Sequence, residues 1–96
     1  QLIQRNYHTR IGEIDLITQN NNSIHFIEVK RWRLSMDNLE YSINSTKQHR
    51  ISRTAAVFLE KNSMYKNYEK QFDVVYIQES RNEIYYIPQA FEGGAE

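Results

Sequence analysis

Two pairs of charged residues lie within apolar stretches in the first third of the chain. Glu13 and Asp15 alternate with apolar residues in one stretch, and Glu28 and Lys30 alternate with apolar residues in the next. Because an unpaired charge is costly to bury, these side chains need compensation from one another or from a cation. Two carboxylates suit Mg²⁺, which takes one or two of them and leaves its other positions to water and phosphate. The chemistry that this set favours is metal-assisted hydrolysis of a phosphodiester.

The two charged stretches are expected to form neighbouring strands of a β-hairpin. Residues 13–19 and 24–32 are rich in the β-branched and aromatic residues that favour strands. Between them, Asn21 and Asn22 are a turn signal, because asparagine tolerates the left-handed conformation that a tight hairpin needs. A two-residue loop at these asparagines would fix the register of the hairpin.

This register predicts a charged cluster on one face of the hairpin. Asp15 would lie opposite Glu28, and Glu13 opposite Lys30. Opposed residues have Cβ atoms about 4.5 to 5.5 Å apart, and two carboxylates so placed repel unless a cation lies between them. Alternating charges on a strand are also typical of a solvated face, and Glu13 with Lys30 could be an ordinary cross-strand ion pair. A slip of one residue would move Asp15 to the other face.

The remaining elements predict a mixed sheet with helical cover. Residues 2–6 favour a first strand, and residues 72–77 and 84–87 favour two later strands, the last ended by Pro88. A helix is expected over residues 45–62. Ser45 and Gln48 have the spacing of a capping box at its start, and the helix carries one apolar stripe: Ile51, Ala55, Phe58 and Leu59. The order of elements predicts an α/β fold.

Length and composition fit one small domain. We expect it to span residues 1–91, with a flexible tail over residues 92–96. The chain has no cysteine, which fits a reducing cytoplasm, and no stretch approaches the ~18 apolar residues of a membrane helix. Its 12 basic and 12 acidic residues argue against a highly basic, histone-like binder. An exposed edge strand would permit a homodimer.

Five short stretches, taken together and in order, resemble the YraN-like family of small bacterial proteins. These stretches are residues 10–17, 26–30, 47–51, 72–75 and 90–91. The first two also look like the D…ExK core of the wider PD-(D/E)xK nuclease superfamily. The family is described as endonuclease-like, so the resemblance implies a restriction-endonuclease-like mixed β-sheet flanked by helices.

The resemblance gives each charged residue of the cluster a role. It implies that Asp15 and Glu28 hold Mg²⁺ or Mn²⁺, that Lys30 is the catalytic lysine, and that Glu13 is a supporting acid at the rim. The implied activity is that of a metal-dependent endonuclease, in which a metal-activated water hydrolyses a phosphodiester of DNA. The alternative is a non-catalytic nucleic-acid-binding module that retains the fold. Members of the superfamily also use an acid from a helix before the first strand, and we expect that helix to be absent from this chain.

Further polar residues are candidates for support and for binding DNA. Phosphate contacts are expected from basic residues near the cluster: Arg10, Arg31, Arg33, Lys47 and Arg50. Any one of these side chains could equally face solvent. Gln48 and Asp73 are candidates for bracing the site, although Gln48 is equally explained by helix capping and Asp73 by pairing with a neighbouring cation.

Overall fold

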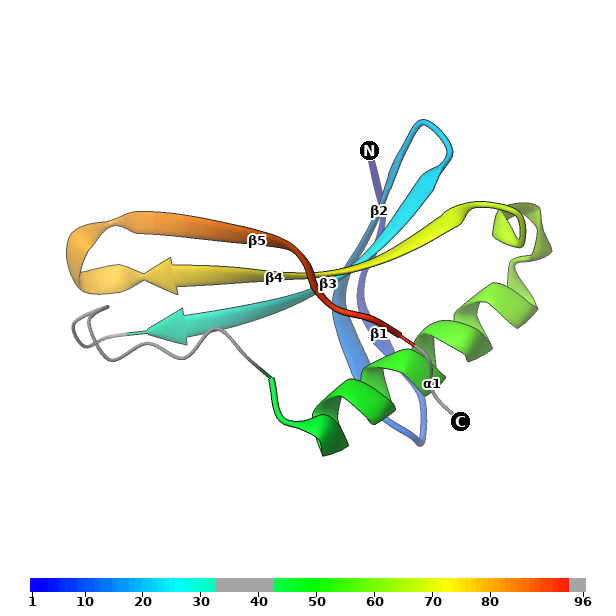
Figure 1. Ribbon diagram of the computed structural model, residues 1–96, viewed down its shortest axis with the longest axis horizontal. Coiled ribbons are helices and arrows are strands. Elements are labelled where there is room, and N and C mark those ends of the chain that lie inside the picture. Colours follow the sequence, from blue (N-terminus) through cyan, green and yellow to red (C-terminus); the bar gives the residue numbers. More distant parts are fainter. Residues whose placement is uncertain (33–42, 94–96) are drawn as a thin grey trace.

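A five-stranded sheet and one long helix make up most of the computed structural model, which describes residues 1–32 and 43–93 (Figure 1). The regular elements in chain order are β1 (Leu2–His8), β2 (Glu13–Asn20), β3 (Ser23–Trp32), α1 (Ser45–Lys61), β4 (Glu69–Gln78) and β5 (Glu83–Phe91). Two single turns of 3₁₀-helix flank β4, at Ser63–Tyr65 and Glu79–Arg81.

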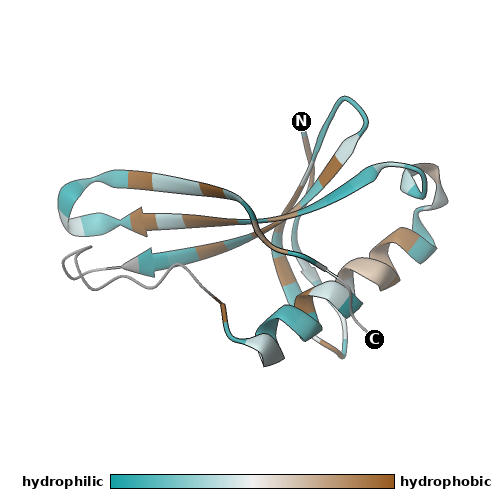
Figure 2. Ribbon diagram, viewed as in Figure 1, coloured by the Kyte–Doolittle hydropathy of each residue, from teal (hydrophilic) through white to brown (hydrophobic). Residues whose placement is uncertain are grey.

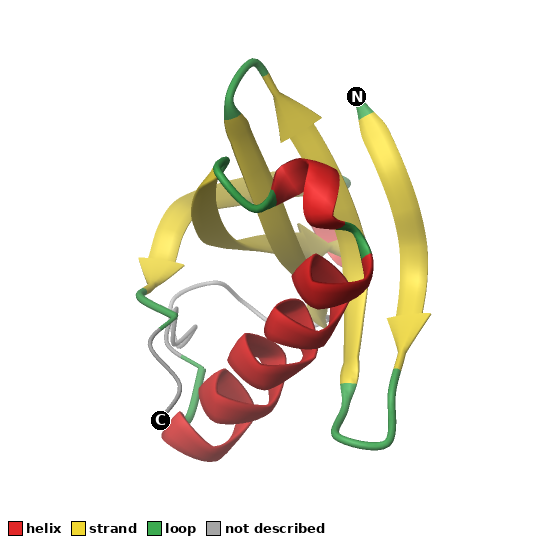
Figure 3. Ribbon diagram, turned by 90° about the vertical axis from the view of Figure 1, so that its right-hand side faces the viewer, coloured by secondary structure: helices red, strands yellow, loops and turns green. Residues whose placement is uncertain are grey.

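The strands lie in the sheet in their sequence order, from β1 to β5. Strands β3 and β4 run parallel and every other neighbouring pair is antiparallel. A parallel pair requires a crossover connection, and α1 lies in that connection, across one face of the sheet (Figure 3). The fold is therefore α/β, consistent with a restriction-endonuclease-like arrangement, and the predicted fold class is confirmed.

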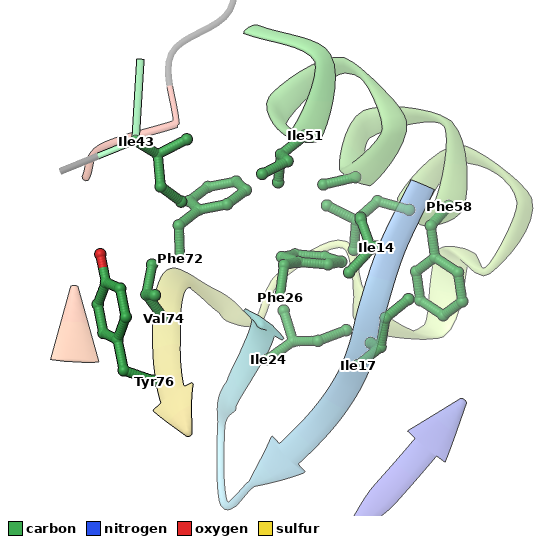
Figure 4. Close-up of a cluster of buried hydrophobic side chains, with 12 residues drawn as sticks. Ile14, Ile17, Ile24, Phe26, Ile43, Ile51, Phe58, Phe72, Val74 and Tyr76 are labelled. Atoms are coloured by element: carbon green, nitrogen blue, oxygen red, sulfur yellow. The ribbon is translucent and has the colours of Figure 1, made fainter. Parts of the chain in front are cut away.

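The hydrophobic core fills the space between α1 and the sheet (Figure 4). Phe26 of β3 stacks on Phe72 of β4 with ring centroids 5.4 Å apart, and Phe58 of α1 meets Phe26 edge-on at 6.2 Å. Full burial of one such side chain contributes about 1.5 to 3 kcal/mol. The predicted stripe of α1 is buried here, so the helical periodicity is confirmed: Ile51, Ala55, Phe58 and Leu59.

Hydrophobic and hydrophilic residues occupy different parts of the sheet. Figure 2 shows hydrophobic segments where the strands pass α1, and mostly hydrophilic residues at the turns. The ends of β3 and β4 and the start of β5 extend to the left of α1 in Figure 1.

Among the described residues, no helix has both the length and the apolar character needed to cross a membrane.

The hairpin of β2 and β3 has the predicted register. Ile17 pairs with Phe26 and Asn20 with Ser23, and Asn21 has the left-handed φ of 55° that the turn requires. The recorded pairs end at Leu16 and Ile27. The two strands thus stop pairing directly before the position of the charged cluster.

The start of α1 differs from the prediction. The N-cap is Asn44 and not Ser45: the Asn44 side chain accepts a hydrogen bond from the backbone N–H of Lys47 at 2.9 Å. The Gln48 amide donates to the backbone carbonyl of Ile43 at 2.6 Å, so it does not close the predicted capping box. Because Ile43 is buried in the core, the chain before the helix is fixed in place and Asn44 becomes the capping residue.

Strand β5 is also longer than the sequence indicated. The prediction that Pro88 ends it is wrong, because β5 continues to Phe91. As an edge strand it tolerates a residue without an N–H group. The register shifts opposite Asp73, where Gln89 has a φ of 48° and donates its backbone N–H to Asp73 Oδ1 at 2.9 Å. The strand therefore passes the proline through a bulge that a buried carboxylate holds.

Candidate metal centre

Asp15 lies where β2 and β3 separate. Its Oδ2 accepts a hydrogen bond from the backbone N–H of Val29 at 2.7 Å, so a side chain takes the place of a strand-to-strand backbone bond. This contact holds the Asp15 carboxylate against β3, next to Glu28. Asp15 and Glu28 were predicted to lie directly opposite each other, but the strand pairing ends one residue before them. The hydrogen bond from the Val29 N–H to Asp15 joins the two segments instead.

Glu28 is a buried carboxylate with only 7% of its surface exposed. Burial is the main cause that raises its pKa above the ordinary value, and the charge of Asp15 and a hydrogen bond to Asp15 raise it further. Lys47 of α1 acts in the opposite direction: its Nζ lies 2.5 Å from Glu28 Oε2. Glu28 therefore interacts with both the Asp15 carboxyl group and the Lys47 ammonium.

Lys30 lies on the same face of β3 as Glu28. Alternate strand residues share a face, and this face carries Phe26 toward the core and α1. Lys30 is partly buried and is in register with Tyr76 of β4. None of the described residues forms a recorded hydrogen bond or ion pair with the Lys30 ammonium. The structure thus brings together Asp15, Glu28 and Lys47, and Lys30 lies two residues further along the same face of β3.

Glu13 lies apart from this group. It is exposed, and its Oε1 lies 3.0 Å from His8 Nδ1 on the neighbouring strand β1, which is also its partner in the sheet. Its predicted partner, Lys30, is on the other side of β2 from β1, in β3. The role of a rim acid for Glu13 stays a prediction.

Two further predicted residues lie on the opposite face of the sheet. Arg31 alternates with Lys30 along β3 and pairs with Glu79 at 2.8 Å. Asp73 alternates with the core residues of β4 and faces away from α1. Neither side chain is brought to the pair formed by Asp15 and Glu28.

Arg10 of the β1–β2 turn and Arg50 of α1 belong to two elements that pack against each other, and we call this pair of arginines the basic border. A Cβ atom added to Gly12 would lie 3.3 Å from the Arg50 Cβ and 3.4 Å from the Thr54 Oγ1, so the turn packs directly on α1. Arg10, in the same turn, and Arg50 are both exposed. Arg33 lies outside the described residues. Gln48 is occupied at the helix start by its bond to the carbonyl of Ile43.

A second polar group, on the opposite face, was not predicted as a unit. The fully buried Asp73 accepts hydrogen bonds from the Gln89 backbone and the Tyr86 hydroxyl, and its Oδ2 lies 2.8 Å from His25 Nδ1. Burial of the phenol, together with this carboxylate, raises the pKa of Tyr86. The sequence placed Asp73 within a strand, but only the pairing of β4 with β3 and β5 determines its neighbours. These bonds fasten β5 to the sheet.

The donor atoms at Asp15 and Glu28 fit a hard divalent cation. The bonds to Val29 and Lys47 use one oxygen of Asp15 and one of Glu28, and the two carboxyl groups also share a hydrogen bond that a cation between them would replace. Among residues 1–32 and 43–93, no three His, Cys, Asp or Glu side chains gather as a ready-made ligand set. A two-carboxylate site is what Mg²⁺ uses when water and phosphate complete its shell.

A surface groove lies away from the carboxylates. It has a volume of about 1080 Å³ and runs along α1 and the end of β5, with Arg53, Lys66 and Lys70 among its lining residues. Neither Asp15 nor Glu28 borders it. The groove and the charged cluster are separate features of the surface.

Comparison with known proteins gives one consistent result. Residues 1–77 match the model of the uncharacterised protein family UPF0102, which is the YraN-like family. A UPF0102 protein of Sulfurihydrogenibium sp. is 35% identical over 92 residues, which cover 95% of this chain and 77% of the relative. A UPF0102 protein of Thermodesulfovibrio yellowstonii is 37% identical over 93 residues, covering 95% and 79%. One from Legionella pneumophila strain Corby is 32% identical over 98 residues, covering 97% and 80%.

Proposed function

The chain belongs to the uncharacterised protein family UPF0102, and we propose that it is a metal-dependent endonuclease of the PD-(D/E)xK type that hydrolyses phosphodiester bonds in DNA. The observation that carries this proposal is the buried Glu28 carboxylate held beside Asp15. The order of the motif supports it as well, because Asp15 comes from β2 and both Glu28 and Lys30 come from β3.

Electrostatics explains why a cation suits this pair. Two like charges about 4 Å apart repel by about 4 kcal/mol at an effective dielectric constant of ~20. The raised pKa of Glu28 means that the folded protein offsets this repulsion by holding a proton more tightly. Asp15 and Glu28 would hold Mg²⁺ or Mn²⁺ in place of that proton. A bound divalent cation would supply Lewis-acid activation of water and neutralisation of phosphate charge.

The other residues of the site act on the DNA. Lys30, on the same sheet face as Glu28, would stabilise negative charge that develops on the phosphate during hydrolysis. Arg10 and Arg50, at the border formed by the β1–β2 turn and α1, would hold the neighbouring backbone phosphates. Such contacts position the DNA without reading its sequence.

A specific contact favours a second candidate function. The ammonium of Lys47 already neutralises part of the charge on Glu28 without any metal. A protein that keeps this ion pair would be a nucleic-acid-binding module that retains the fold without catalysis. Its affinity for DNA would come from the same basic border and would fall steeply with added salt.

Cleavage assays with the full chain separate the two functions. The protein is incubated with single-stranded, duplex and branched DNA in Mg²⁺ or Mn²⁺, beside Asp15→Asn, Lys30→Ala and the matched control Lys61→Ala at the far end of α1. The proposal expects cleavage by the wild type and by Lys61→Ala, with loss of cleavage in the other two variants. Cleavage retained by Asp15→Asn and Lys30→Ala would refute the assignment of the site. DNA binding without cleavage by any form would favour the second function.

Location and assembly are part of the proposal. A nuclease that acts on chromosomal DNA would work in the cytoplasm of a bacterium, and the absence of cysteine fits that reducing compartment. Strands β1 and β5 are the edges of the sheet, and β5 exposes 70% of Ile84. An edge of this kind would support a homodimer, which sedimentation at several protein concentrations would detect.

A further inference from the structure

Lys47 contacts the candidate metal ligand Glu28 from the first turn of α1. We propose that Lys47 is an exchangeable counter-ion, which neutralises Glu28 while no divalent cation is bound and moves to a DNA phosphate when one binds. This inference rests on the proposed function, since it requires that Asp15 and Glu28 hold a cation. It adds a coupling between metal binding and DNA binding through one side chain.

The exposure of the two partners is unequal. The Glu28 side chain is 8% exposed, and the Lys47 side chain is 46% exposed. A carboxylate as buried as Glu28 requires a counter-charge, whereas the lysine ammonium is solvated on one side and loses little when it leaves. The contact is therefore needed by Glu28 more than by Lys47.

The charges at the site explain why Lys47 would leave. The Lys47 ammonium already neutralises one of the two carboxylate charges, and Lys30 lies two residues beyond Glu28 on the same face of β3. A divalent cation on the same two carboxylates would make the ammonium surplus, and it would place two cations a few ångströms apart in a partly buried site. Repulsion at such a distance is strong because solvent screens it poorly.

The local structure allows Lys47 to move without disturbing the helix. The backbone N–H of Lys47 donates to the Asn44 side chain at 2.9 Å, and this capping bond fixes the start of α1. The ammonium sits at the end of a flexible four-carbon chain, so it can turn outward while the backbone stays in place. The bond that orders the helix and the bond that holds Glu28 are thus independent.

The released ammonium would remain at the basic border. Arg50 follows Lys47 by three residues on α1, so the two side chains are neighbours on the helix surface. The turn that carries Arg10 packs on α1 at Arg50. A phosphate held by these arginines would be within reach of Lys47, and it would take over the role of Glu28 as the partner of the ammonium.

The first test measures how reactive each lysine is. The protein is treated with an amine-acylating reagent with and without Mg²⁺, and modification of Lys47 is measured by mass spectrometry against Lys61 in the same molecule. Release of the Lys47–Glu28 ion pair is expected to raise the acylation rate of Lys47, measured relative to that of Lys61, about fivefold. This is the size of effect expected from losing a strong exposed ion pair. In Asp15→Asn, which lacks one metal ligand, Mg²⁺ is expected to change nothing.

The second test measures DNA affinity as a function of salt. It uses the Lys30→Ala background, which keeps both carboxylates. Each phosphate contact adds about 0.9 to the slope of log affinity against log salt on duplex DNA. With Mg²⁺, Lys47→Gln is expected to reduce the magnitude of this slope by about 0.9, the amount for one phosphate contact. Without Mg²⁺ the substitution is expected to leave the slope unchanged. Lys61→Gln, a lysine on the same helix but away from the site, is the matched control and should have no effect in either condition.

Metal binding itself is monitored in parallel by titration with Mn²⁺, and it separates the two proposals. Binding of Mn²⁺ with no change in Lys47 labelling would overturn the counter-ion exchange and leave the metal centre in place. Failure of the wild type to bind Mn²⁺ would overturn the proposed function and this inference with it. An equal effect of Lys47→Gln on the salt slope with and without Mg²⁺ would show a permanent phosphate contact and would also overturn the exchange.

Discussion

Replacement of Asp15 by asparagine is expected to stabilise the protein when no metal is bound. The asparagine carbonyl can still accept the hydrogen bond that the Val29 N–H donates at 2.7 Å, so the link between β2 and β3 is kept. What disappears is the negative charge beside the buried Glu28. A functional site built from like charges commonly lowers stability, and removing one charge should restore part of it.

The expected gain is about 1 to 2 kcal/mol in the free energy of unfolding near neutral pH. Two bare charges about 4 Å apart would repel by about 4 kcal/mol at an effective dielectric constant of ~20. Lys47 already offsets part of this repulsion. Asp15 is also partly exposed, so solvent screens a further part.

The gain should depend on pH. Because its pKa is raised in the folded protein, Glu28 binds a proton more tightly there than in the unfolded chain. The stability that this provides is present at low pH and is lost as pH rises through the folded-state pKa. Asp15→Asn removes one cause of the raised pKa. The variant should therefore lose less stability than the wild type as pH rises, and the two should differ least at low pH, where the raised pKa leaves Glu28 protonated and uncharged.

Urea unfolding followed by circular dichroism, with a chelator present, measures this difference. Glu13→Gln is the matched control, because Glu13 is an exposed carboxylate on the same strand and should change stability by less than about 0.5 kcal/mol. If Asp15→Asn unfolds at a lower urea concentration than the wild type at about pH 8, the carboxylates do not repel as argued. A gain of equal size at low and high pH would also refute the electrostatic explanation.

Three further predictions test the fold. Asp73→Asn should lower the free energy of unfolding by about 2 to 4 kcal/mol in a urea titration, because it disrupts a buried network; a loss below 0.5 kcal/mol would contradict this role. Asn44→Ala should cost about 1 kcal/mol by the same assay through loss of the cap on Lys47, and Ser45→Ala should cost much less; equal losses would mean that Asn44 is not the cap. Gly93→Ala should lower the midpoint of thermal unfolding, since its Cβ would clash with the Phe72 ring, and an unchanged midpoint would show that this segment moves aside freely.

Local patterns predicted the elements that depend on neighbours in sequence. The β2–β3 register followed from two asparagines that admit a left-handed turn, and the buried side of α1 followed from apolar spacing. The ends of elements were less accurate. The helix cap moved by one residue to Asn44, and β5 continued past Pro88, because buried partners at Ile43 and Asp73 fixed the backbone there.

The sequence by itself determined the chemistry available to this protein, namely two carboxylates and a lysine on adjacent strands of one hairpin. The tertiary structure decided which charges share a site. It placed Lys47 against Glu28, left Glu13 with His8, and turned Asp73 to the opposite face. These outcomes depend on how β4 pairs in parallel with β3 and on how α1 crosses the sheet. Both arrangements join residues that are distant in the chain, and no local periodicity or turn signal specifies them.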